Sequence, residues 1–210
     1  MKQKTYYHII LDQRGSMQNC IHPVISGYNE QIQAIKSLEE RFPEQEVRVG
    51  LTRFNENVMH SYFGEQPGLV TELNENTYRP NGMTALLDAT GMTTMVLNRK
   101  IQQELATGIA TAVVVIITDG HENASRHFKL PQVRSMIGDL EATGKWTFSY
   151  LGATLDAVDV ATSLNIQRGN SMHFDKMRMD ESFTTLEASM NDYLTNKRNG
   201  KISSEFLSKK

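Results

Sequence analysis

Short apolar runs alternate along this chain with longer stretches in which apolar residues recur every three or four positions. The runs predict strands and the recurring spacing predicts amphipathic helices, because side chains three and four apart share one face of a helix. The predicted strands cover residues 5–11, 47–54, 112–117, 146–151 and 171–174, and the predicted helices cover residues 21–42, 84–107, 130–140, 155–164 and 183–194. This alternation favours an α/β fold with a doubly wound, mostly parallel sheet and helices on both faces.

One predicted hairpin interrupts the alternation. Asn55-Glu56-Asn57 has the composition of a turn, and residues 58–63 read as a short partner for the strand before it, which predicts one antiparallel strand at the edge of the sheet. Residues 64–83 have the least pattern, so we expect a functional or mobile connection there. We predict a single domain over residues 1–198 and a polar, frayed tail over residues 199–210.

Charge and cysteine content narrow the possible partners. The 210 residues include 22 Lys and Arg against 24 Asp and Glu, so nothing in the net charge favours nucleic acid or an anionic membrane surface as a partner. Cys20 is the one cysteine, which excludes an intrachain disulfide and favours a reducing compartment. We therefore expect a cytoplasmic protein.

Polar oxygens follow apolar elements at three places. Asp12 ends the first predicted strand and Ser16 follows it, Thr84 precedes a predicted helix, and Asp119 follows the apolar run 112–117. Ligands of doubly wound sheets bind at the carboxyl ends of the strands, so we expect these four side chains to converge. Two carboxylates and two hydroxyls are suitable ligands for Mg²⁺ or Mn²⁺, with water or a partner's carboxylate completing the shell.

These stretches resemble a known metal site. Leu11–Met17, Gly82–Leu86 and Ile117–Gly120 are similar to the metal-ion-dependent adhesion site of von Willebrand factor type A (vWA) domains, whose motif runs Asp-x-Ser-x-Ser, then Thr, then Asp. The resemblance is greatest to the small stand-alone bacterial members and covers roughly residues 5–195. It implies a Rossmann-like sheet and metal-assisted binding of another protein, with Asp12, Ser16, Thr84 and Asp119 as the metal ligands.

The chain departs from this motif at Arg14, where the family has its first serine. An inward-pointing guanidinium would repel a divalent ion by about 8 kcal/mol before screening, if the charges lie about 4 Å apart at an effective dielectric constant of about 20. Arg14 could instead act as a substitute cation between the two aspartates, or turn outward and merely weaken the site. We expect an acidic residue of the partner at a rim that comprises Gln13, Arg14, Gly82, Met83, His121 and Glu122.

Two other functions remain open. The chain could be a metal-free scaffold that binds its partners through other surfaces. It could also be a Mg²⁺-dependent phosphohydrolase with Asp12 as nucleophile, but position 14 lacks the second carboxylate such enzymes use, and no phosphate-cradling glycine loop or Gly-x-Ser-x-Gly elbow occurs. We expect a protein-binding module and no enzyme.

Overall fold

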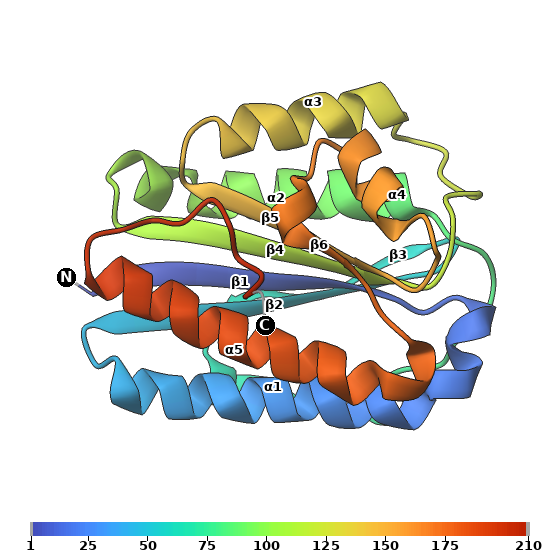
Figure 1. Ribbon diagram of the computed structural model, residues 1–210, viewed down its shortest axis with the longest axis horizontal. Coiled ribbons are helices and arrows are strands. Elements are labelled where there is room, and N and C mark those ends of the chain that lie inside the picture. Colours follow the sequence, from blue (N-terminus) through green and yellow to red (C-terminus); the bar gives the residue numbers. More distant parts are fainter. Residues whose placement is uncertain (1, 209–210) are drawn as a thin grey trace.

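The computed structural model describes residues 2–208 and contains a six-stranded sheet between two layers of helices (Figure 1). The strand order is β3-β2-β1-β4-β5-β6, and each neighbouring pair is parallel except β2 with β3. The strands are β1 (Gln3–Asp12), β2 (Gln45–Phe54), β3 (Val58–Glu65), β4 (Ala110–Thr118), β5 (Trp146–Gly152) and β6 (Ser171–His173). This arrangement confirms the predicted Rossmann-like α/β fold with one antiparallel edge strand.

Five α-helices are described, and they divide between the faces of the sheet: α1 and α5 cover one, and α2, α3 and α4 cover the other (Figure 1). Their bounds are α1 (Ile21–Arg41), α2 (Leu86–Ala106), α3 (Leu130–Glu141), α4 (Ala157–Ser163) and α5 (Met179–Arg198). The predicted helices agree with these bounds to within a few residues, except that Thr84 precedes α2 and the last helix begins earlier than its apolar stripe. The hydrophobic periodicity therefore predicted both helical layers.

Both faces of the sheet are buried, which explains why its central strands read as continuous apolar runs. In β1, Tyr7, Ile9 and Leu11 belong to the core under α1 and α5, whereas Tyr6 and Ile10 belong to the core under α2 and α3. Every residue of β4 is buried. A strand with apolar partners on both sides needs no polar alternation.

The strand order reverses between β1 and β4, and this switch point positions the candidate site. The two strands are parallel neighbours, and Leu11 pairs with Ile117 in their register. Asp12 is the last residue of β1, and Asp119 follows directly after β4. Their carboxylates therefore leave the same edge of the sheet from adjacent strands, where ligands of such sheets bind.

The connection between β3 and α2 is more ordered than its composition predicts. It contains a short 3₁₀-helix, η2 (Pro67–Leu69), and buries Leu73 and Tyr78. The Tyr78 hydroxyl donates a hydrogen bond of 2.7 Å to the backbone oxygen of Asp12. This segment therefore supports the end of β1.

The prediction of a frayed tail from residue 199 is wrong for residues 206 and 207. Phe206 and Leu207 are buried, and the Phe206 ring lies 5.9 Å from that of Tyr7. The Phe206 N–H also donates to the Asn170 side chain at 2.7 Å. A polar composition concealed these two apolar contacts, and residues 209–210 lie outside the described part of the chain.

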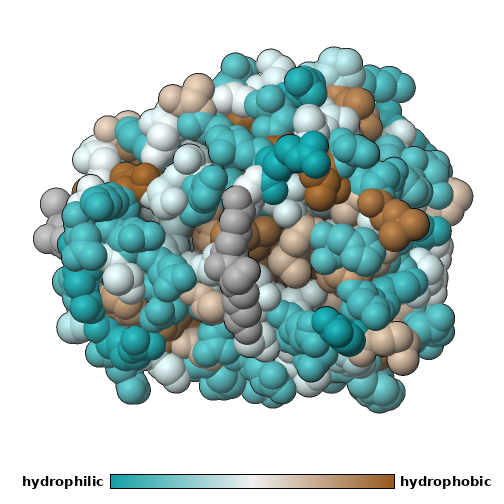
Figure 2. All heavy atoms as spheres, viewed as in Figure 1, coloured by the Kyte–Doolittle hydropathy of each residue, from teal (hydrophilic) through white to brown (hydrophobic). Residues whose placement is uncertain are grey.

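Hydrophilic residues predominate on the face shown in Figure 2, and hydrophobic ones appear there in separate groups. Within residues 2–208, no helix has the length and apolar character that spanning a membrane requires. The large apolar side chains gather mainly in the two cores described above.

Candidate functional site

The Asp12 carboxylate is fully buried and both of its oxygens are occupied. Oδ1 accepts the backbone N–H of Arg14 at 2.8 Å, and Oδ2 accepts the Thr118 hydroxyl at 2.5 Å. Desolvation raises the pKa of Asp12 to about 7, although these two hydrogen bonds oppose the rise. Asp12 therefore joins the ends of β1 and β4, and its ionised form depends on positive charge nearby.

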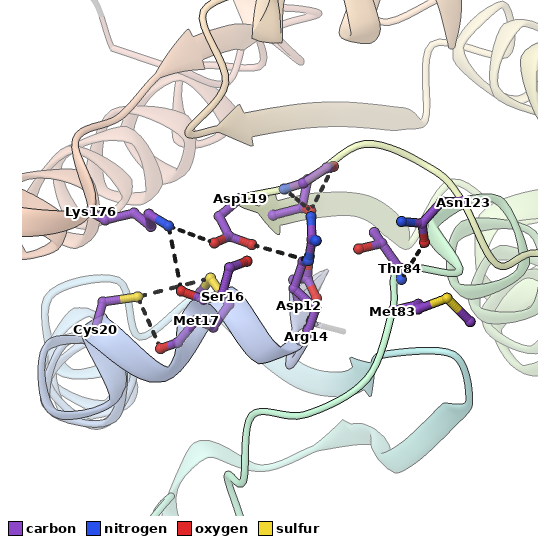
Figure 3. A network of polar contacts seen from close by, with 12 residues as sticks. Asp12, Arg14, Ser16, Met17, Cys20, Met83, Thr84, Asp119, Asn123 and Lys176 are labelled. Carbon is purple, nitrogen blue, oxygen red and sulfur yellow. Dashed lines mark hydrogen bonds and ion pairs between the residues drawn. The ribbon is translucent and has the colours of Figure 1, made fainter.

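The Asp119 carboxylate is also fully buried, with a cation beside each oxygen (Figure 3). Lys176 Nζ lies 2.9 Å from Oδ2, and Arg14 Nε lies 4.0 Å from Oδ1. The first contact is a hydrogen-bonded ion pair, whereas the second is longer than a hydrogen bond. Asp119 therefore already has two positive partners within the chain.

Arg14 points inward, which the sequence left open. Figure 3 shows its side chain rising between Asp119 and Thr84, and it is 26% exposed. A Cβ added to Gly120 would lie 1.8 Å from Nη1 of Arg14, so the guanidinium packs directly on the backbone after Asp119. Glycine at this position leaves the room that the arginine occupies.

Lys176 is a site residue that our sequence analysis missed. It belongs to the 3₁₀-helix η4 (Lys176–Arg178), directly before α5. Its Nζ donates to the backbone oxygen of Ser16 at 3.4 Å and to Oδ2 of Asp119 at 2.9 Å. Lys176 therefore bridges the loops after β1 and β4. No motif marks this lysine, and the only signal was the need of two buried carboxylates for positive charge.

Ser16 and Thr84 contribute hydroxyls that lack partners. Ser16 Oγ, Thr84 Oγ1 and Asp119 Oδ1 are buried without a hydrogen-bond partner among the described residues. Thr84 itself is held in place by Asn123, whose side-chain oxygen accepts the Thr84 N–H at 2.9 Å and whose own N–H donates to the Thr84 backbone oxygen at 3.0 Å. All four predicted ligand residues thus lie at this edge of the sheet, Asp12 at the end of β1 and the other three in the connections that follow strands.

Gln13 and Gly82, predicted as rim residues, contact other site loops. The buried Gln13 accepts the N–H of Asn81 at 2.9 Å through its backbone oxygen and donates from Nε2 to the backbone oxygen of Arg79 at 2.9 Å. Gly82 has φ of +71°, and a Cβ there would collide with Glu56. Its backbone oxygen accepts the N–H of Gly15 at 3.2 Å. Both residues therefore fix the loop after β1.

The other predicted rim residues differ in what they offer a partner. Met83 is 49% exposed, and the His121 side chain is 61% exposed, 3.7 Å from Asp156. Glu122, in contrast, accepts N–H groups of Ala124, Ser125 and Leu87, together with the Ser125 hydroxyl. Its carboxylate holds its own loop and the start of α2, which leaves Met83 and His121 as the freer contacts.

The residues present do not fit a resident divalent ion. Three orphaned oxygens would suit a hard cation, but both oxygens of Asp12, one of the two carboxylates among the predicted ligands, already accept hydrogen bonds. Arg14 and Lys176 already lie beside the Asp119 carboxylate, and the charge of Arg14 also favours the ionised form of Asp12. A divalent ion would place two more positive charges beside these cations, at a few ångströms and largely out of water.

Comparison with known proteins gives the fold but no close relative. No family model and no curated protein matches the sequence. Solved structures that resemble it include the pilus adhesin SpaC from Lactobacillus rhamnosus GG in its open conformation, with a TM-score of 0.65, 13% identity, 91% of this chain covered and 30% of the adhesin. A von Willebrand factor type A protein from Catenulispora acidiphila has a TM-score of 0.53 and 14% identity, and the match covers 90% of this chain and 42% of that protein. The ArnB paralog VWA2 from Sulfolobus acidocaldarius has a TM-score of 0.53 and 14% identity, and the match covers 89% of this chain and 45% of that protein.

The chain spans less than half the length of each of these three structures. At 13 or 14% identity the similarity shows the fold alone. The protein therefore has a von Willebrand factor type A-like fold.

Proposed function

We propose that this chain is a protein-interaction module that binds an acidic side chain of a partner at the loops that follow β1 and β4. Domains with this fold commonly mediate protein interactions. The partner's Asp or Glu would contact the guanidinium of Arg14, with Met83 and His121 at the rim. Arg14 acts here as a substitute for a metal ion.

The state of the Arg14 side chain carries this proposal. Its guanidinium makes no hydrogen bond to an acceptor within residues 2–208, although it is only 26% exposed. A planar fork of N–H donors without acceptors is costly at a half-buried position, and a carboxylate is its best bidentate complement. The proposed ligand would therefore satisfy donors that the folded chain leaves open.

A displayed peptide library tests the proposal directly. The unmodified protein should enrich peptides that carry Asp or Glu at one fixed position, and exchange of that residue for Asn or Gln should abolish binding. Arg14→Gln should remove the enrichment. The matched control Arg168→Gln changes an exposed arginine in the 3₁₀-helix η3 (Arg168–Asn170) and should leave it intact. Enrichment that ignores acidic residues, or that survives Arg14→Gln, would refute the proposal.

A second candidate is the metal-free scaffold that binds through another surface. A groove of 670 Å³ between α2 and α3, lined by Met95, Met136 and Leu140 among others, favours this alternative. Such a scaffold would select peptides whose binding is unaffected by Arg14→Gln and lost in Met95→Glu. The same library therefore separates the two candidates.

The burial of Asp12 speaks against the phosphohydrolase alternative. A nucleophilic carboxylate must reach the phosphorus of its substrate, whereas Asp12 is 0% exposed and both of its oxygens accept hydrogen bonds. We therefore propose a role for Asp12 in holding the site together and none in catalysis.

A further inference from the structure

We propose that Arg14 and Lys176 together replace the divalent ion of a vWA-type site, so that this site takes a carboxylate without any metal. The ligand class rests on the function proposed above. The exclusion of metal depends only on the chain itself and can be tested without a partner.

Charge matching is the first support. Two buried carboxylates, Asp12 and Asp119, end neighbouring strands. The chain supplies two positive charges beside Asp119, Arg14 from the loop after β1 and Lys176 from the segment before α5, and the charge of Arg14 also lowers the pKa of Asp12 against the effect of burial. These two charges equal the charge of a divalent ion, so the site needs no further cation to balance its carboxylates.

The placement of Lys176 is the second support. Its ammonium contacts Asp119 Oδ2 at 2.9 Å and the Ser16 backbone oxygen at 3.4 Å, and thereby joins two loops that a metal ion would otherwise join. The position of the lysine is fixed, because the Asp175 side chain accepts the Met177 N–H at 2.9 Å and Met179 is fully buried at the start of α5. Lys176 therefore holds the site from the α5 side.

The donors that remain define the ligand. Lys176 directs donors to two acceptors within the described residues, so one of its three N–H groups remains for a ligand. Arg14 offers its fork without an acceptor of its own. A guanidinium that binds two oxygens and an ammonium that adds one contact suit the carboxylate of an Asp or Glu side chain. Figure 3 shows the two cations on either side of Asp119.

Calorimetric titration with MgCl₂ and MnCl₂ tests the exclusion of metal. The unmodified protein should give no saturable heat. Arg14→Ser restores the hydroxyl of the family motif and Lys176→Met removes the second charge, so the double variant should bind Mg²⁺ at least about tenfold more tightly than either single variant. A matched double control, Arg168→Ser with Lys201→Met, removes two exposed charges elsewhere and should bind no metal.

Two results would overturn the inference: saturable Mg²⁺ binding by the unmodified protein, or a double variant that folds and binds none. Circular dichroism and thermal melting establish folding. Should Lys176→Met with Arg14→Ser fail to fold, Lys176→Gln in the same background keeps a neutral donor on Asp119 and takes its place in the titration. Failure of the proposed function would appear separately, as loss of acid-dependent peptide enrichment with the metal result unchanged.

Discussion

Acid should destabilise this protein through His8, a buried histidine in the middle of β1. His8 is 1% exposed, and its Nε2 lies 2.9 Å from the Thr52 hydroxyl. Its ring centroid lies 4.7 Å from that of Phe63, and a Cβ added to Gly50 would lie 2.1 Å from its Nδ1. This environment has no room for the water that an imidazolium needs.

Desolvation, with a smaller contribution from His60, lowers the pKa of His8 from 6.5 to about 3. Between these values the unfolded chain binds a proton at His8 that the folded chain does not bind, so the free energy of unfolding falls as the pH falls from about 6.5 towards 3. At about pH 4.5 the pH lies about two units below the pKa of His8 in the unfolded chain, and only the unfolded chain is protonated there. The free energy of unfolding is therefore lower by about 2.7 kcal/mol than at neutral pH. Above about pH 6.5 this loss vanishes.

Urea denaturation at several pH values between about 4.5 and 7.5 measures the effect as a difference from His8→Gln, which cannot titrate. The difference in free energy of unfolding should change by roughly 2 to 3 kcal/mol across this range. His22→Gln alters a histidine whose side chain is 83% exposed and serves as the control. If His8→Gln and the unmodified protein lose stability in parallel, the assignment of the acid sensitivity to His8 is refuted.

Three further predictions concern the loops, the helices and a buried lysine. Glu122→Ala should lower the free energy of unfolding by about 3 kcal/mol, because four donors lose a charged acceptor. Urea denaturation measures this effect. An unchanged denaturation midpoint would assign Glu122 to the binding rim instead. Gly27→Ala should lower the free energy of unfolding by about 1 to 3 kcal/mol, since the new Cβ would lie 2.1 Å from the Phe183 ring. The control Gly68→Ala adds a Cβ with no atom within 4 Å and should leave the melting temperature near that of the unmodified protein. Burial lowers the pKa of Lys197 from 10.5 to about 8, so the stability of the unmodified protein relative to Lys197→Met should rise by about 2 kcal/mol from about pH 8 to 10; a flat difference would contradict it.

The sheet could be predicted because each central strand carries its own signal. The run Ala112–Ile117 is apolar on both faces and lies within β4, which is buried throughout, and Pro43 and the Asn55-Glu56-Asn57 turn mark the two ends of β2. The common edge of the strand ends was also predictable, since parallel strands joined by helices bring their carboxyl ends to one edge. The convergence of Asp12 with Asp119 followed from the chain topology alone.

The composition of the site could not be predicted in the same way. Lys176 is one lysine in the polar segment before α5, and its place on Asp119 depends on how η4 and α5 pack against the loop after β1. The direction of the Arg14 side chain depends on the space above Gly120. The hydrophobic periodicity of the sequence gives no information about that space. Such contacts join loops far apart in sequence and arise only from tertiary packing.

The fold therefore determines where two carboxylates meet, whereas a few loop residues determine what neutralises them. Asp12 and Asp119 follow from the ends of β1 and β4, and burying two like charges requires compensation. Arg14 and Lys176 both lie outside the strands and outside the two hydrophobic cores. Exchange of these two side chains for neutral ones should therefore change how the site is compensated and leave the strand order unchanged. If the double exchange creates a Mg²⁺ site, two substitutions at the edge of one sheet separate a metal-free site from a metal-dependent one.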